Sequence, residues 1–446
     1  MTNTLYLPEL RVMLADNDVA ELQEFCTALH PARTVEFMEG LSVEEAWQVL
    51  RHTDAATRAE IFHYFDRERQ VQTIETMDRA EVAQLVADLA PDERVDILNQ
   101  VDPQVVDQLL SLLPADERRD YLRLRAYPEG TAGAVMTTQF ARLSEHLTVN
   151  AALEELRRQV ESLETVYYLY VVDHEDHLRG LVSLRQLVLA KPETLIGDIM
   201  ERAVVSVHVS DDQEDVAKTL ARFDFLAIPV VDSEYHLCGI VTHDDVIDVV
   251  REEATEDAHR SGAVAPLREG YLETQILTLT WKRGLWLTIL FFGGLLTAVS
   301  LRRHESFFEH LPWLVLFIPL VISSGGNSGS QSATLIITAL STGDLRVADW
   351  LRVVWRELIM GLLLGGFLGL LGYIPAMLLA PDWQAAMVVP LTVISVVTCG
   401  TLTGSMLPLV FRRLGLDPAL MSNPFVACIS DIVGIVVYTS VAIALL

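Results

Sequence analysis

The 446-residue sequence has few cysteines, few basic side chains relative to its acidic ones, and few charges of either sign after residue 280. Its four cysteines are far apart and form no Cys-x-x-Cys pair, which excludes a disulfide framework or a thiolate zinc site as the basis of the fold. We expect isolated buried thiols. The chain has 33 basic and 61 acidic side chains, for a formal net charge of −28 and no basic patch. This charge excludes nucleic-acid binding and favours a cationic partner.

The charges are also unevenly distributed along the chain. Residues 1–280 hold 53 acidic and 24 basic side chains, whereas residues 281–446 hold 8 acidic and 9 basic ones. These counts predict an acidic soluble part followed by an apolar part. The N-terminus lacks the basic and apolar segments of a secretory signal, so we expect the acidic part to stay in the cytosol. The sequence also lacks a Walker P-loop and any catalytic constellation, and we expect no enzyme activity.

Membrane spans can be read directly from the uncharged runs after residue 280. Four runs reach the roughly 18 to 20 residues that a helix needs to cross a bilayer, namely 284–301, 312–343, 358–381 and 383–411. A fifth run, 418–446, contains one charged residue, Asp431. We therefore predict five transmembrane helices, at about residues 284–302, 313–340, 351–380, 386–411 and 422–446.

Lysine and arginine in the predicted loops set the orientation. One side of the membrane carries seven such residues, and the other side carries only Arg302 and Arg303. The seven are Lys282, Arg283, Arg346, Arg352, Arg356, Arg412 and Arg413. Because positive charge marks the cytoplasmic side, we expect the N-terminus inside and the C-terminus outside.

Asp431 lies about eight residues into the fifth predicted span, roughly 12 Å deep at about 1.5 Å per residue. An acid at this depth is costly unless it faces protein or water, and it marks a site for a cation or a proton. Ala427 and Gly434, one turn to either side, would leave room for a hydrated ion. An ion pair or a hydrogen bond between helices would also explain the acid, but the cores of the other spans contain no lysine or arginine.

A glycine and amide tract, Ser323–Ser332, occupies the second predicted span. Glycine weakens a helix and polar side chains resist transfer to lipid, so we expect the tract not to face lipid. It fits close packing of helices, a wall of a water-filled path, or both. Glu357, near the cytoplasmic start of the third span, is a further candidate, although its side chain could simply reach the membrane surface.

Residues 1–130 are predicted to form short helices in series. Aspartate or proline recurs as a helix start signal at Asp66, Asp78, Pro91, Asp102 and Pro114. This spacing predicts a small superhelix of stacked helices. Asp92 and Asp96 share one helix face, and alone they would be explained as a solvated face.

Residues 135–255 contain an internal repeat. Segment 167–188 matches 225–247, and the motif Val171, Val172, Asp173 and Gly180 recurs 59 residues later as Val230, Val231, Asp232 and Gly239. Each unit is predicted as strand, turn, strand and helix, and the pair resembles tandem cystathionine-β-synthase (CBS) domains. In that family a Gly-x-x-Thr-x-x-Asp pattern often holds an adenine nucleotide. The second unit has the full pattern, Gly239, Thr242 and Asp245, whereas the first has Ser183 and Gln186, so one nucleotide per pair and none both remain open.

A carboxylate-rich helix is predicted at residues 244–257, between the repeat and the first span. Its like charges repel at spacings of three and four residues, so the helix must be well solvated or bind cations.

With these parts in this order, the chain resembles the MgtE family of bacterial magnesium transporters. The most specific segments are 319–336 and 414–434. The resemblance implies a multidomain membrane protein of four parts. These are an all-α superhelical N domain (1–130), an α/β tandem CBS pair (131–200 and 201–250), an acidic connecting or plug helix (251–280, starting near 244) and a five-helix α transmembrane domain (281–446).

The resemblance also implies a homodimer with an ion path along its two-fold axis. The pore residues would be Asp431, Ala427, Gly434, Asn327, Gln331, Asn423 and Glu357. Cytosolic Mg²⁺ would close the path by bridging carboxylates of the N domain, the CBS pair and the connecting helix. Those carboxylates would be Glu60, Asp92, Asp96, Glu214, Asp224, Asp245, Asp248, Glu253, Glu256 and Asp257.

We therefore expect a magnesium-selective, channel-like transporter of the bacterial cytoplasmic (inner) membrane, which cytosolic Mg²⁺ closes and which ATP, where bound, regulates. Its partners would be a second copy of the chain, lipid and Mg²⁺, with no nucleic acid. Two alternatives remain open. The same architecture could carry manganese, cobalt or protons, or the chain could be a membrane-anchored nucleotide sensor. Asp431 argues against the sensor, since an anchor needs no buried acid.

Overall fold

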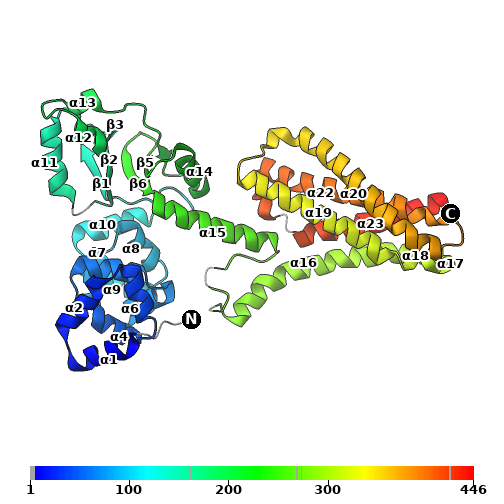
Figure 1. Ribbon diagram of the computed structural model, residues 1–446, viewed down its shortest axis with the longest axis horizontal. Coiled ribbons are helices and arrows are strands. Elements are labelled where there is room, and N and C mark those ends of the chain that lie inside the picture. Colours follow the sequence, from blue (N-terminus) through cyan, green and yellow to red (C-terminus); the bar gives the residue numbers. More distant parts are fainter. Residues whose placement is uncertain (1–5, 161–162, 268–269, 273, 421–422) are drawn as a thin grey trace. The chain divides into compact units, whose positions relative to one another are not determined.

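The computed structural model describes residues 6–160, 163–267, 270–272, 274–420 and 423–446 (Figure 1). The chain divides into two compact units, Met1–Val250 and Arg251–Leu446. The division falls inside helix α15 (His243–Ser261), so this helix contributes residues to both units.

The first unit begins with ten short helices among the described residues, which confirms the predicted helical domain. The side chains of Asp66, Asp78 and Asp102 each accept a hydrogen bond from a backbone N–H of the following helix, as their positions predicted. The buried apolar side chains form a core that continues into the second CBS unit. The helices are α1 (Leu7–Asp16), α2 (Val19–Ala28), α3 (Pro31–Met38), α4 (Val43–Leu50), α5 (Ala55–His63), α6 (Arg67–Thr76), α7 (Arg79–Asp88), α8 (Pro91–Leu98), α9 (Pro103–Leu112) and α10 (Ala115–Leu124).

Each CBS unit contains a three-stranded sheet, with strand order β1-β2-β3 in the first and β4-β5-β6 in the second. The last two strands of each sheet pair antiparallel in the same register, with Val171 opposite Gly180 and Val230 opposite Gly239. The predicted sequence repeat is therefore a structural repeat. The strands are β1 (Phe140–Leu143), β2 (Thr165–Val172), β3 (Leu178–Ser183), β4 (Val207–His208), β5 (Ala227–Val231) and β6 (Leu237–Thr242), and the helices are α11 (Val149–Gln159), α12 (Leu184–Leu189), α13 (Ile196–Ile199) and α14 (Gln213–Phe223).

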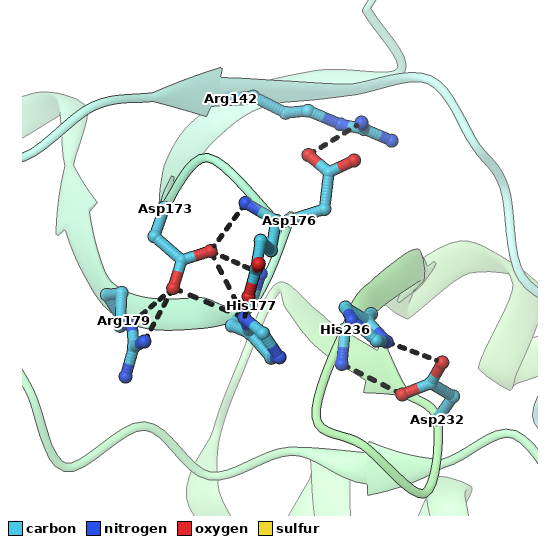
Figure 2. Close-up of polar contacts among 8 residues, drawn as sticks. Arg142, Asp173, Asp176, His177, Arg179, Asp232 and His236 are labelled. Atoms are coloured by element: carbon cyan, nitrogen blue, oxygen red, sulfur yellow. Dashed lines mark hydrogen bonds and ion pairs between the residues drawn. The ribbon is translucent and has the colours of Figure 1, made fainter.

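The hairpin turns of the two CBS units meet each other (Figure 2). Asp173 and Asp232 occupy equivalent positions, and each accepts hydrogen bonds from backbone N–H groups two and four residues later. The rings of His177 and His236 stack, with their centroids 4.4 Å apart. The two sides differ in charge, because Asp173 also forms an ion pair with Arg179.

The acidic connecting helix is shorter than predicted. α15 ends at Ser261, and Ala263 then adopts the left-handed conformation, with φ of 58°. The N–H groups of Gly262 and Ala263 bond back to carbonyls of the last helical turn, which closes the helix. The predicted extension of this helix to residue 280 is therefore wrong, and residues from Ile276 onward belong to α16.

The second unit contains five long helices in its described residues, α16 (Ile276–Arg303), α19 (Ile318–Ser341), α20 (Trp350–Leu379), α22 (Val388–Arg413) and α23 (Asn423–Leu445). Four ranges are long and apolar enough to cross a membrane, namely Ile276–Arg303, Val347–Leu379, Trp383–Arg413 and Asn423–Leu445. α19 has 24 residues, but it contains the polar tract and is not among these four. Short helices α17 (Glu305–His310), α18 (Pro312–Val315) and α21 (Trp383–Ala386) connect the long ones.

The long helices differ in how deeply they are packed. α22 packs against α19, α20 and α23, whereas α16 contacts the bundle mainly through α23. Lys282 and Arg283, predicted to precede the first span, lie inside α16, because this helix continues beyond its apolar run. Residue 422, the predicted start of the fifth span, lies outside the described residues, and α23 is described from Asn423.

Candidate functional site

The first candidate site lies where α19 and α23 pack together beside Asp431. The Asp431 side chain is partly buried, and Gly326 of α19 faces it. A methyl group added at Gly326 would lie 3.7 Å from a carboxylate oxygen of Asp431 and 3.5 Å from the Cβ atom of Ala427. In the described part of the chain, no lysine or arginine forms an ion pair with Asp431. Among the described residues, Asp431 is therefore not neutralised by a basic side chain.

α19 presents two chemically different faces. Ser323, Asn327, Gln331 and Thr334 are exposed in the single chain and lie three or four residues apart, so they form one polar stripe. The amide of Asn327 donates a hydrogen bond to the hydroxyl of Ser323, 3.2 Å away. Two of the predicted pore residues, Asn327 and Gln331, therefore share one exposed face of α19.

The opposite face of α19 packs against α22 through glycine. A methyl group added at Gly400 would lie 2.4 Å from the carbonyl oxygen of Gly325, and one added at Gly404 would lie 2.0 Å from that of Gly329. Only glycine permits backbones to approach this closely. Both functions expected of the tract thus have separate residues: its glycines pack helices, and its amides lie on the polar stripe. Gly434 also belongs to the packing, since it is buried near Val396.

Two other predicted pore residues tie the helices together. The Ser330 hydroxyl donates to the backbone carbonyl of Asn423 at 3.1 Å, and the Thr334 hydroxyl donates to its side-chain oxygen at 3.2 Å. Glu357 of α20 is only 9% exposed, and Ser332 donates to its carboxylate at 2.6 Å. Asn423 thus fixes the start of α23 on α19, while Glu357 lies within the packing of α19 and α20. Its side chain is buried in the bundle, whereas the sequence had left open an exposed position at the membrane surface.

The second candidate site is a group of carboxylates in the first unit around Asp92 of α8. Asp92 is 9% exposed, and one of its carboxylate oxygens is buried without a hydrogen-bond partner. Burial, together with the nearby charge of Asp245, raises the pKa of Asp92 well above its ordinary value. Burial also raises the pKa of Asp245 to about 6, although the hydrogen bond from Thr242 opposes this effect.

The neighbours of Asp92 increase the negative charge of this site. Glu93 and the exposed Glu164 lie within electrostatic reach of Asp92, and neither is among the sensing residues predicted from the sequence. Glu93 is paired with His63, and this contact raises the pKa of the imidazole. Glu164 directly precedes β2, a position that carries no local sequence signal. Within the described ranges, no three His, Cys, Asp or Glu side chains converge closely enough to form a metal cage.

The remaining predicted sensing residues are dispersed. Glu214 pairs with Lys218 on α14 at 2.7 Å, and Asp224 ends that helix in the left-handed conformation. Glu60 lies on α5, Asp96 on α8 and Asp248 on α15. In the second unit, Asp257 accepts a hydrogen bond from Ser341 at 3.2 Å, and Glu256 forms an ion pair with Arg260. Glu253 lies on the same helix.

The predicted nucleotide pattern is partly occupied by the protein itself. Thr242 is buried and bonds to Asp245, and Gly239 packs directly against the backbone of Thr137. A cavity of about 560 Å³ lies instead at the first CBS unit, lined by Tyr168, Ser183 and Arg185 among others. Ser183, which lines this cavity, is the serine of the incomplete pattern, in which Gln186 stands in place of the acid.

Comparisons with known proteins agree with this architecture. The divalent cation transporter model of MgtE matches residues 318–441, the MgtE intracellular N domain matches 29–130, and CBS domains match 132–193 and 196–252. The magnesium transporter MgtE of Thermus thermophilus is 44% identical over 328 residues, 72% of each chain. Its namesake in Enterococcus faecalis is 38% identical over 320 residues, 71% of this chain and 69% of that protein.

Solved structures resemble the first unit. The crystal structure of the soluble part of a magnesium transporter is 38% identical and covers 55% of this chain and 97% of its own, with a TM-score of 0.53. The cytosolic domain of the Mg²⁺ channel MgtE in complex with ATP is 36% identical and covers 54% of this chain and 98% of its own, with a TM-score of 0.51. With an N domain, a CBS pair and a bundle of apolar helices that each match their counterparts, the chain belongs to the MgtE family of divalent cation transporters.

Proposed function

We propose that this protein is a magnesium-selective, channel-like transporter of the bacterial cytoplasmic membrane, with its N-terminus in the cytosol and its C-terminus outside. The observation that carries the proposal is Asp431, an acid within a long apolar helix that has no basic partner among the described residues. Its relatives named as magnesium transporters support the choice of ion. The seven basic residues counted on one side support the orientation.

The surroundings of Asp431 suit an ion that retains its hydration shell. Mg²⁺ dehydrates reluctantly and usually retains several water molecules, so a site for it needs carboxylates and space more than a tight cage. Gly326 and Ala427, which have no side chain and a small one, lie beside the Asp431 carboxylate. Asn327 and Gln331 add amide groups on the polar stripe, which can hydrogen-bond to the water shell of the ion.

The polar stripe of α19 supports a homodimer. In a membrane, exposed amides and hydroxyls are costly unless protein or water covers them. A second copy of the chain related by a two-fold axis would cover this face and place two Asp431 side chains along one path. The ion would then be held between two carboxylates, which matches its charge.

The Asp92 group supports closure by cytosolic magnesium. Its neighbouring carboxylates, Asp245 and Glu93, raise the cost of charging Asp92, and a divalent cation would remove that cost. The unpaired buried oxygen of Asp92 fits a metal-bound water or a metal ion. Here Asp92 and Asp245 would hold the ion and thereby join the N domain to the CBS pair and the start of α15. Without the ion, mutual repulsion would loosen this junction.

ATP is proposed as a regulatory ligand. A relative of the first unit has been solved in complex with ATP. The full Gly239, Thr242 and Asp245 pattern remains one candidate site, and the cavity at the first CBS unit is the other. There Tyr168 offers an aromatic face for a base and Arg185 a charge for phosphate.

Uptake of magnesium into proteoliposomes tests the proposed function. Asp431→Asn removes the charge and keeps the shape, and we expect at least about a tenfold loss of flux, because the ion loses its charged ligand. Asp382→Asn is the matched control, since Asp382 caps α21 through a hydrogen bond that asparagine can also accept. Equal flux in wild type and Asp431→Asn would refute the pore assignment. Flux of Mn²⁺ or Co²⁺ but not Mg²⁺ would favour the alternative cargo, and no ion flux together with ATP binding would favour the membrane-anchored sensor.

A further inference from the structure

Arg260 joins the acidic helix to the segment that leads into the candidate pore helix. It lies in the last turn of α15, where it forms ion pairs with Glu256, one turn earlier, and with Asp417, 157 residues away in the chain. Asp417 lies between α22 and α23 and accepts a hydrogen bond from the backbone N–H of Ala419 at 2.8 Å. The guanidinium of Arg260 therefore bridges Glu256 of the acidic helix α15 and Asp417 of the helix bundle.

The environment of this bridge favours a specific contact. The side chains of Arg260, Glu256 and Asp417 are 31%, 33% and 28% exposed, so water screens the pairs less than it would at a fully open surface. A positive charge in the last turn of a helix also interacts favourably with the helix dipole. A second contact, from the Ser341 hydroxyl at the end of α19 to Asp257, lies on the neighbouring turn of α15.

The position of Asp417 connects this bridge to the helix that carries Asp431. It lies fourteen residues before Asp431, and Asn423, at the start of α23, is bonded to α19 by Ser330 and Thr334. The division between the two compact units falls after Val250, so the half of α15 that carries Arg260 belongs to the membrane unit. The other half belongs to the unit that contains Asp92 and Asp245.

We infer that Arg260 is a positioning residue for gating: its ion pair with Asp417 anchors the acidic helix to the pore helix and transmits movement of the CBS pair to Asp431. This inference rests on the proposed function. In this arrangement the anchor favours the docked, closed state of α15 even before magnesium binds. Removing it should therefore raise the magnesium concentration that is needed for closure.

Charge substitutions in the full-length protein test the anchor. In detergent, protease cleavage of residues 244–257 is measured against magnesium concentration, and flux is measured in proteoliposomes. Arg260→Gln and Asp417→Asn should each raise the half-protecting concentration by about fivefold, the factor that corresponds to about 1 kcal/mol. Arg260→Glu should raise it further, and Arg260→Glu combined with Asp417→Arg should return it to within about twofold of wild type, because the swap restores the pair.

Arg413→Gln is the matched control, since Arg413 is exposed in the last turn of α22 and its substitution removes the same charge near the same segment. The inference would be overturned if Arg260→Gln had the same half-protecting magnesium concentration as wild type. It would also be overturned if the effects of Arg260→Glu and Asp417→Arg simply added in the double variant. A wild type that shows magnesium-dependent protection but no magnesium flux would contradict the proposed function and leave the anchor standing.

Discussion

Replacing Gly404 by alanine should separate two helices that the bundle holds in backbone contact. The new methyl group would lie 2.0 Å from the carbonyl oxygen of Gly329, whereas ordinary contact begins at 3.4 Å. The oxygen belongs to the backbone and cannot rotate away, so α19 and α22 would have to move apart locally by about 1.4 Å. The same helix α19 carries the polar stripe with Asn327 and Gln331, so this movement would also disturb the candidate ion path.

The size of the effect follows from two opposing contributions. Overpacking a tight interior costs roughly 1–3 kcal/mol. Alanine is a better helix former than glycine and returns up to about 1 kcal/mol. We therefore expect Gly404→Ala to lower the free energy of unfolding by up to about 2 kcal/mol. Gly366→Ala is the matched control, because no atom lies within 4 Å of the methyl group that it would add to α20.

Thermal unfolding of the purified protein in detergent, followed by tryptophan fluorescence, measures this difference. Gly404→Ala should unfold at a lower temperature than wild type, and Gly366→Ala at the same or a higher temperature. Magnesium flux should fall in Gly404→Ala and be retained in Gly366→Ala. If the two variants were equally stable, the close contact between α19 and α22 would not be what holds these helices together.

Two further predictions concern the CBS pair. Asp232 raises the pKa of His236, so protonation of His236 contributes stability that is fully present below about pH 6.5 and is lost as the pH rises through the raised value. Asp232→Asn should therefore lower the melting temperature more at pH 5.5 than at pH 8. Asp173→Asn should lower the melting temperature at pH 8 as well, because its partner Arg179 stays charged there. Equal losses at both pH values in Asp232→Asn would refute this reasoning. For the nucleotide, Tyr168→Ala should weaken ATP binding about tenfold in calorimetry if the cavity is the site, and loss of binding in Asp245→Asn alone would place ATP at the second CBS unit.

Much of the fold was predictable because the responsible signals are local. Asp66, Asp78 and Asp102 were identified as helix start signals, and each caps a helix. The repeat in the CBS pair predicted a shared strand register, since Val171 and Val230 recur with the glycines opposite them. Apolar runs marked the long helices because burial in lipid requires continuous apolar sequence.

The remainder depended on contacts between distant segments. The tract Ser323–Ser332 indicated both helix packing and a polar path, but only the fold shows that Gly325 and Gly329 serve packing while Asn327 and Gln331 are exposed. The end of α15 was predicted wrongly because Gly262 and Pro266, which follow the acidic segment, were not used as a stop signal. In the structure the helix closes there, with Ala263 in the left-handed conformation.

α19 carries the polar tract and is not among the four ranges that have the length and hydropathy of a membrane span. α19 packs against α22 and α23, and α22 in turn packs against α20, so its neighbours can face the lipid in its place. A helix shielded in this way does not need apolar side chains on every face. Its glycines then bring α22 close, its exposed face carries amides and hydroxyls, and Gly326 lies beside Asp431. A polar face this long is tolerated in a membrane only against water or protein, which supports the proposal that α19 lines the path that Asp431 serves.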